Sequence, residues 1–133
     1  MTQEEKRNLL LRDLCARLPF EVKVKVECTT ANGEKIEDEG VLNSIFINEF
    51  GTIYVCVDEI EYELEHLKPY LRSMLSMTEE EKMKLSLSQI YAFTYYNEIA
   101  KIDWLNKHHF DYRGLIDRGL AIEVTEENNP YKE

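Results

Sequence analysis

The first 19 residues have the pattern of an amphipathic helix. Thr2 and Glu5 form a capping-box pattern, in which each side chain accepts a hydrogen bond from an amide of the first turn. The apolar residues that follow recur at helical spacing and are Leu10, Leu11, Leu14 and Leu18. Pro19 disfavours helical backbone at the residue before it. We therefore expect an N-terminal helix within residues 1–19.

The period of the pattern then changes to two. From Phe20 to Cys28 the even positions are apolar and the odd positions are charged, which is typical of a half-buried antiparallel strand. Asn32 and Gly33 predict a tight hairpin turn, because both residues tolerate positive φ. Further strands are predicted at residues 35–38, 41–47, 52–57 and 60–64.

Five short strands within about 45 residues indicate a small, strongly curled sheet. We expect it to close, because an open sheet of this size would leave unpaired edges. Pro69 is expected to end the β region. The sequence therefore predicts a small antiparallel, SH3-like curled barrel over residues 20–68.

The last part of the chain has mainly helical signals. Thr78 and Glu81 form a second capping box, and irregular helical spacing then favours two helices with a break near residues 86–88. A short helix is expected at 111–118, followed by a last strand at 120–124. We expect residues 74–124 to form a helical C-terminal part packed on the barrel, and 125–133 to be a flexible tail. The fold class is therefore α+β.

The charge of the chain narrows the classes of partner. It has 133 residues, with 16 Lys and Arg against 26 Asp and Glu, and a net charge of −10. Binding to a nucleic-acid backbone or to anionic lipid depends on Lys and Arg, so neither direct nucleic-acid binding nor membrane binding is expected. No apolar run approaches the length of a membrane span or of a signal sequence.

Cysteine usage indicates the compartment. Cys15, Cys28 and Cys56 are odd in number and far apart, and no CxxC spacing occurs. We interpret them as reduced, mostly buried thiols of a cytoplasmic protein.

Several phrases of the sequence together resemble a known family. They lie at residues 13–19, 68–72, 77–81, 102–106, 109–116 and 119–123, and the longest is His109-Phe110-Asp111-Tyr112-Arg113-Gly114-Leu115-Ile116. The chain resembles a family of uncharacterised small proteins encoded by anaerobic gut bacteria and by their phages and prophages. The resemblance covers most of the chain, and residues 84–98 depart from it. It implies an accessory protein of a phage or mobile element in the bacterial cytoplasm, and it transfers no catalytic residue.

Two clusters near the C-terminal end have both a chemical and a structural interpretation. His108, His109 and Asp111 are residue types that bind metals or act as a base with its orienting partner, as a metal-dependent enzyme would need. Adjacent helical side chains point about 100° apart, so we favour histidines at a helix end and Asp111 as the cap of the next helix. Charged residues at 111–118 are interpreted as a structural ion-pair set and not as a partner surface.

Aromatic residues concentrate between residues 91 and 112. They are Tyr91, Phe93, Tyr95, Tyr96, Trp104, Phe110 and Tyr112. Stacking of single-stranded bases uses such residues together with a cationic groove, and this stretch has few cations. We interpret the set as helical core, with a protein-binding face as the alternative.

The acidic residues concentrate in the predicted β region. Residues 34–65 contain ten acidic residues and one lysine, a net charge of −9. Within them, Glu59, Glu61, Glu63 and Glu65 alternate with apolar residues, and a strand would project them from one face at intervals of about 7 Å. Such a row resembles the phosphates of a nucleic acid, although it also suits a solvated face that keeps sheet edges unpaired.

These observations favour a non-enzymatic interaction or regulatory module. No GxSxG, P-loop, GxGxxG or HExxH motif occurs, and we predict no metal and no cofactor. The predicted contact surface for a basic protein partner consists of Glu37, Asp38, Glu39, Glu59, Glu61, Glu63 and Glu65. The alternatives are a nucleic-acid mimic that inhibits a DNA-binding enzyme and a structural or assembly protein, and the sequence does not fix the oligomeric state.

Overall fold

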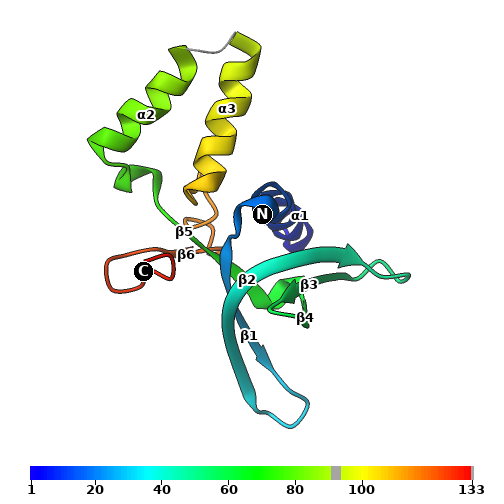
Figure 1. Ribbon diagram of the computed structural model, residues 1–133. Coiled ribbons are helices and arrows are strands. Elements are labelled where there is room, and N and C mark those ends of the chain that lie inside the picture. The colour runs from blue at the N-terminus through cyan, green and yellow to red at the C-terminus, as the bar shows by residue number, and fades with distance from the viewer. Residues whose placement is uncertain (91–93, 133) are drawn as a thin grey trace.

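The protein, represented by a computed structural model that describes residues 1–90 and 94–132, is an α+β structure (Figure 1). Its helices are α1 (Gln3–Arg17), α2 (Glu79–Ile90) and α3 (Thr94–Lys107). Its strands are β1 (Lys23–Thr29), β2 (Lys35–Ile47), β3 (Ile53–Val57), β4 (Ile60–Glu63), β5 (Leu67–Leu71) and β6 (Ile122–Glu123). Short 3-10 turns occur at Leu18–Phe20, Leu64–His66 and Met74–Ser76. None of the helices within the described ranges combines the length and the apolarity needed to cross a bilayer.

The N-terminal helix confirms its predicted start. The Thr2 Oγ1 accepts a hydrogen bond from the Glu5 amide, and the Glu5 carboxylate accepts one from the Thr2 amide, both at 3.1 Å. Both partners of the capping box are thus satisfied, and the helix ends at Arg17, before Pro19.

The strands form one mixed sheet in the order β4-β3-β2-β1-β5-β6. All neighbouring pairs are antiparallel except β5 and β6, which are parallel at Tyr70–Ile122 and Leu71–Glu123. The sheet is open, because β4 and β6 lie at opposite edges and do not pair with each other. The closure that we expected is therefore wrong, and β4 is an edge strand that carries the exposed side chains of Glu61 and Glu63.

The sheet differs from the prediction at Gly40 and at Pro69, where strands were expected to end. The segments 35–38 and 41–47 are one long strand, β2, which curves through Gly40 (Figure 1). A Cβ at Gly40 would lie 1.9 Å from the Asp58 carboxylate, so the absence of a side chain lets β2 continue there. Pro69 lies inside β5, opposite Val24 of β1, and does not end the β region.

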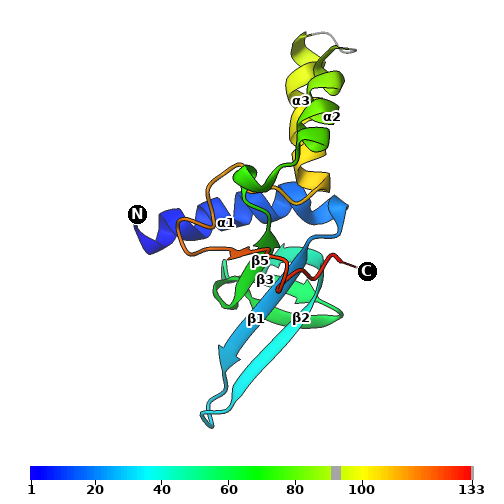
Figure 2. The same ribbon diagram turned by 90° about the vertical axis from the view of Figure 1, so that its left-hand side faces the viewer.

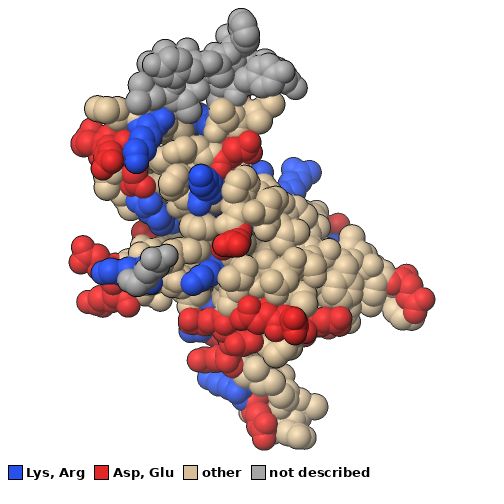
Figure 3. Space-filling view, viewed as in Figure 1, with Lys and Arg blue, Asp and Glu red and all other residues tan. Residues whose placement is uncertain are grey.

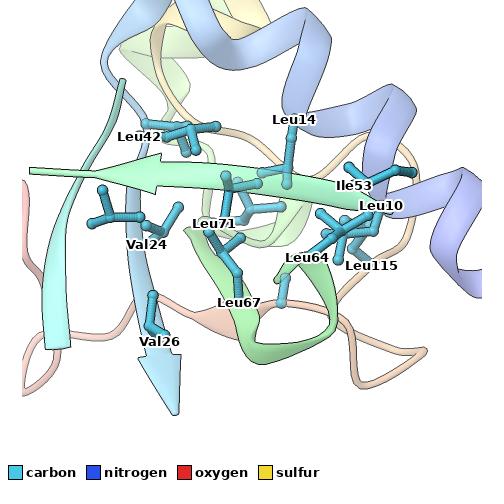
Figure 4. Packing of buried hydrophobic residues seen from close by; sticks show 14 residues of the cluster. Leu10, Leu14, Val24, Val26, Leu42, Ile53, Leu64, Leu67, Leu71 and Leu115 are labelled. Atoms are coloured by element: carbon cyan, nitrogen blue, oxygen red, sulfur yellow. The ribbon is translucent and has the colours of Figure 1, made fainter. Parts of the chain in front are cut away.

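The main core lies between α1 and the concave face of the sheet. The even residues of the first strand segment, Val22, Val24 and Val26, are fully buried, which confirms the period-two pattern. Figure 4 shows Leu10 and Leu14 of α1 directed toward the sheet side chains that complete this core. The core thus rests on the two elements whose patterns are the most regular in the sequence.

The helices α2 and α3 form a hairpin that projects away from the sheet. In Figure 2 the hairpin and the sheet lie on opposite sides of α1, so the expected packing of this part on the sheet is not seen. Its base has a small core of its own, formed by Met77, Leu105 and Phe110. The helix α2 continues through residues 86–88, where a break was expected, and ends at Ile90.

The segment after α3 returns to the sheet without the predicted helix. Residues 111–118 form turns, because Gly114 has a φ of +75° and the Asp111 carboxylate binds the amides of Leu115 and Ile116, both at 2.9 Å. The strand β6 then lies within the predicted range 120–124. The expected flexible tail has no helix or strand in residues 125–132, although the Tyr131 hydroxyl donates to the Tyr70 carbonyl at 2.8 Å.

Candidate functional site

The β3–β4 hairpin determines where the four alternating glutamates lie. Asp58 and Glu59 form its two-residue turn, both with positive φ, so Glu59 lies in the turn and outside the strand. Glu61 and Glu63 lie in β4 opposite Cys56 and Tyr54, and both are exposed on the outer face of the sheet.

Glu65 follows in the 3-10 turn after β4 and is also exposed. The row of acidic side chains on one strand face therefore contains two of the four predicted glutamates, Glu61 and Glu63. The sequence pattern of alternation is correct, but the strand is too short to hold all four.

The second part of the predicted surface lies on β2, where three consecutive acidic residues alternate between faces. Glu37 and Glu39 are exposed on the outer face, opposite Glu27 and Lys25 of β1. The Tyr70 hydroxyl donates to the Glu39 carboxylate at 2.5 Å. Burial, and then this bond, raise the pKa of Tyr70 well above its ordinary value.

Asp38 points to the other face of β2. Its carboxylate accepts a hydrogen bond from the Tyr62 hydroxyl at 3.0 Å, and both side chains are half-buried. Burial, and then the bond to Asp38, raise the pKa of Tyr62. Asp38 therefore links β2 to β4 on the face of the sheet opposite to that of Glu37 and Glu39.

Apolar side chains border the two strand glutamates. Tyr54, which is opposite Glu63, stacks on Phe46 of β2 with ring centroids 5.5 Å apart. At the tip of the β2–β3 hairpin, Ile47 is 62% exposed and Phe50 is 83% exposed. The sequence patterns did not predict that Phe46, Ile47 and Phe50 would be exposed together. Their position just before Gly51, a residue that often marks a turn, was a signal of an exposed hairpin end.

The acidic side chains gather on one part of the molecule. Figure 3 shows a band of acidic side chains across the sheet, and further acidic side chains beside the Lys and Arg of the helical hairpin and the C-terminal segment. On the outer face of the sheet, Lys25 lies opposite Glu39, and its amine forms a hydrogen bond of 3.2 Å with Glu27. That hydrogen bond, helped by Glu37 and Glu39, raises the pKa of Lys25.

The chain matches no protein-family model, and its comparison with curated proteins and with solved structures gives no significant match. The geometry of the sheet edge is therefore the basis on which we assign a function.

The histidine and aspartate cluster is separated into three different environments. His108 lies against Trp104 with ring centroids 4.3 Å apart, whereas His109 stacks on Tyr131 at 3.7 Å. The Asp111 carboxylate is occupied by two backbone amides of the following turn. Within residues 1–90 and 94–132, no group of three or more His, Cys, Asp and Glu side chains has the arrangement needed to hold a metal ion.

The predicted ion-pair set at 111–118 is replaced by a buried network that sequence analysis missed. Asp13 of α1 lies 2.7 Å from the Arg17 Nε and 3.3 Å from the Arg113 Nη1. The Arg17 Nη2 donates to the Phe110 carbonyl at 2.6 Å. The i, i+4 spacing of Asp13 and Arg17 was visible in the sequence, but their complete burial was not.

The aromatic residues at the base of the hairpin pack as the structural interpretation predicts. Trp104 and Phe110 stack with ring centroids 5.7 Å apart, and Tyr112 packs against the same small core. Tyr91 and Phe93 lie outside the described residues, as do the side chains of Tyr95 and Tyr96.

The three cysteines are free thiols. Cys28 and Cys56 are half-buried, but Cys15 is exposed on α1, so the expectation of mostly buried thiols is wrong at this position.

Proposed function

We propose that this protein is a non-enzymatic interaction module whose acidic sheet edge binds an extended, basic segment of a protein partner. The observation that carries the proposal is the open edge of β4, where Glu61 and Glu63 lie. The family resemblance supports a setting in the bacterial cytoplasm, as an accessory protein of a phage or mobile element.

The backbone of β4 supplies the first part of the recognition. Val57 and Ile60 flank the two-residue hairpin turn and form its hydrogen-bonded pair. Because pairs alternate in an antiparallel ladder, the amides and carbonyls of Glu61 and Glu63 point away from β3, toward the open edge. A partner segment in extended conformation can pair with these groups as an added strand.

The side chains at this edge supply the second part. Lys or Arg residues at alternate positions of an added strand would lie beside Glu61 and Glu63, which are exposed. Apolar residues of the same partner segment would contact Phe46 and Tyr54, which lie beside the two glutamates. The charge and the apolar border together favour a partner segment that mixes basic and apolar residues.

The same charges disfavour a second copy of this chain as the occupant. Pairing β4 with another β4 would place glutamates opposite glutamates, and like charges directly opposite each other destabilise a strand pair. The edge is therefore better suited to a different, basic protein than to self-assembly.

The two alternatives have less support. A nucleic-acid mimic needs a longer row of evenly spaced charges, and β4 aligns only Glu61 and Glu63. Assembly of copies of this chain through β4 is disfavoured, because Glu61 and Glu63 would lie opposite like charges.

We also propose that β1–β5 form an SH3-like unit in open form. Support comes from the order of the five strands, the pairing of β5 with β1, and the 3-10 turn Leu64–His66 between β4 and β5. The long curved β2, which pairs with both β1 and β3, also supports this assignment.

The test uses a synthetic ten-residue peptide that alternates Lys with Val, followed by backbone amide NMR. We expect saturable shift changes at Glu61 and Glu63, and an affinity that falls by at least tenfold between 50 and 300 mM NaCl. In the double variant Glu61→Gln and Glu63→Gln, the affinity should fall by a further factor of about ten.

The control separates the site from the overall charge. Glu98→Gln and Asp103→Asn remove the same charge from exposed positions of α3 and should leave the affinity within twofold of the unaltered protein. A matched peptide that alternates Glu with Val should not bind. The proposal fails if the Lys peptide leaves the β4 amides unchanged, or if both double variants weaken binding equally.

A further inference from the structure

A second surface of the molecule has the opposite charge. Two open hollows of about 800 and 770 Å³ lie between α3, the start of β1 and the C-terminal segment. Both are lined by Lys107, His109, Tyr131 and Lys132, so they are two parts of one basin. We call it the His109 basin. Its lining includes neither Glu61 nor Glu63, and it does not depend on the function proposed above.

Cations outnumber acids in the lining of this basin. Lys23, Lys107, Lys132 and Arg72 line it, with Arg72 paired to Glu81 at 2.7 Å, whereas Glu21 and Glu126 are its acidic residues. Lys107 and Lys132 are exposed, and neither forms an ion pair with a described residue. The amine of Lys23 donates to the Pro130 carbonyl at 2.7 Å, a contact that leaves its charge unneutralised. A basic basin is notable in a chain whose net charge is −10.

His109 holds an unusual position in the wall. Its φ is +63°, a left-handed conformation that costs energy in a residue with a side chain. Its backbone carbonyl accepts a hydrogen bond from the Arg72 amide at 2.8 Å, and its ring stacks on Tyr131 with an interplanar angle of 10°. These contacts fix the imidazole in the wall of the basin.

Two buried polar atoms in this region lack hydrogen-bond partners within the described chain. They are the His109 Nδ1 and the Arg17 Nη1, and Arg17 is fully buried. Unsatisfied buried donors and acceptors are rare in folded proteins, and a bound ion or water commonly accounts for them.

The electrostatics of His109 agree with this geometry. Burial is the main cause that lowers the pKa of His109 to about 4, and the charges of Arg17, His108, Arg72 and Lys23 lower it further. Arg17 has the largest effect among these charges, although its guanidinium is paired with Asp13 at 2.7 Å. Lys23 of β1, Arg72 after β5 and Lys107 at the end of α3 line the hollow beside His109.

We propose that the His109 basin binds a doubly charged oxyanion of the phosphate or sulfate type. Lys107 and Lys132 would contact the anion from the rim, and Lys23 would add a third positive charge at the start of β1, whereas Arg17 is buried behind the wall and paired with Asp13. The stacked rings of His109 and Tyr131 form the aromatic part of the wall, so the oxyanion is either a free ion or the phosphate of a small molecule that carries an aromatic base.

The first experiment uses sodium sulfate as the probe, because sulfate keeps its double charge across the range of interest. The His109 ring resonances are followed by NMR between pH 3.5 and 8, with chloride added to hold the ionic strength constant. We expect saturable shifts at His109 and Tyr131, and a rise of at least one unit in the pKa of His109 at saturation. By linkage, sulfate should then bind at least tenfold more tightly to the protonated imidazole than to the neutral one.

The second arm replaces sulfate with adenosine monophosphate. Stronger binding than sulfate at equal charge, with shifts at the Tyr131 ring, would identify the phosphate of an aromatic small molecule as the ligand. Equal or weaker binding would identify the free ion.

The variants distinguish a site from general attraction. Lys107→Gln with Lys132→Gln should weaken sulfate binding at least tenfold. Lys35→Gln with Lys84→Gln removes the same charge from exposed positions on β2 and α2 and should change the affinity less than twofold. Shifts that never saturate, or equal weakening by both pairs, would overturn the proposal.

Discussion

Arg72 joins the sheet to the helical hairpin through a two-pronged ion pair with Glu81. The Nη1 and Nη2 of Arg72 each donate to the Glu81 carboxylate at 2.7 Å, and the guanidinium lies 4.1 Å from the Phe110 ring centroid. The side chains of Arg72 and Glu81 are only 25% and 19% exposed. The hydrogen bond from Arg72 is the main cause that lowers the pKa of Glu81 to about 2. Among the carboxylates in the described part of the chain, Glu81 has the pKa that departs most from its ordinary value.

The Arg72–Glu81 pair should make the stability of the protein sensitive to acid. The pKa of Glu81 is lower in the folded chain than its ordinary value of 4.5, so between these values the unfolded state binds more protons. The stabilisation is therefore complete above pH 4.5 and disappears as the pH falls toward 2. We expect Glu81→Gln to cost about 1–3 kcal/mol at pH 7 and much less at pH 2.5, measured by urea unfolding.

A neighbouring glutamate provides the control for this prediction. The Glu80 side chain is 79% exposed, and Glu80→Gln should change the free energy of unfolding by less than about 0.5 kcal/mol at either pH. His109 also favours unfolding in acid, because its pKa is lowered to about 4, but its contribution is the same in both variants. Parallel stability curves for Glu81→Gln and the unaltered protein would contradict the assigned pair.

At the residue scale, the sequence predicts contacts that are local. The capping boxes of Thr2 with Glu5 and of Thr78 with Glu81 were identified from spacing alone, and both form. The pairing of Asp13 with Arg113 joins residues 100 positions apart, and no local pattern predicts it. The same holds for the His109 basin, because its cations come from four separate segments.

At the element scale, regular periodicity predicts well and interrupting residues mislead. The helix α1, the strand β1 and the start of α2 follow patterns that a buried face imposes on the sequence. Pro69 and Gly40 are residue types that predict strand ends, but Pro69 lies inside β5 and Gly40 inside β2. At Gly114 the interrupting residue has the opposite outcome, because its positive φ prevents the helix that is expected at residues 111–118.

The hairpin of α2 and α3 should unfold locally without the sheet. It has a separate small core and projects from the far side of α1 (Figure 2). Thr78→Ala removes the hydroxyl that accepts from the Glu81 amide at 3.1 Å and should cost about 1 kcal/mol. We expect amide hydrogen exchange in α2 to accelerate about fivefold, while exchange at Val24 and Val55 stays unchanged.

The matched variant for this prediction is Thr2→Ala, which removes the equivalent cap from α1. Because α1 covers the main core, this variant should raise exchange in the sheet as well. Equal acceleration at Val24 in both variants would mean that the hairpin and the sheet unfold as one unit.

At the scale of the whole molecule, the acidity of this chain is a local property. Nearly all of the excess charge lies within residues 34–65, and in Figure 3 it forms a band over the sheet. Strand register then decides what each charge does. Glu37 lies directly opposite Glu27, whereas Glu39 lies directly opposite Lys25 and accepts a hydrogen bond from Tyr70.

Two substitutions with the same change in net charge should therefore have opposite effects on stability. Glu37→Gln removes a like-charge pair and should stabilise the protein by about 0.2–1 kcal/mol at low salt. Glu39→Gln removes an opposite-charge pair and weakens the Tyr70 contact, so it should destabilise by about 0.5–2 kcal/mol. Urea unfolding at 20 mM NaCl measures both values.

Salt separates the two explanations further. If general self-repulsion governed stability, both substitutions would stabilise equally, and 500 mM NaCl would remove both effects. If strand register governs stability, salt should abolish the gain from Glu37→Gln but retain most of the loss from Glu39→Gln. The Glu39→Gln substitution removes the carboxylate that accepts from the Tyr70 hydroxyl, and Tyr70 is buried, so salt cannot compensate for the lost contact. The sign of the Glu39→Gln effect at high salt thus decides whether the acidic sheet acts as a uniform charge or as an arrangement of specific pairs.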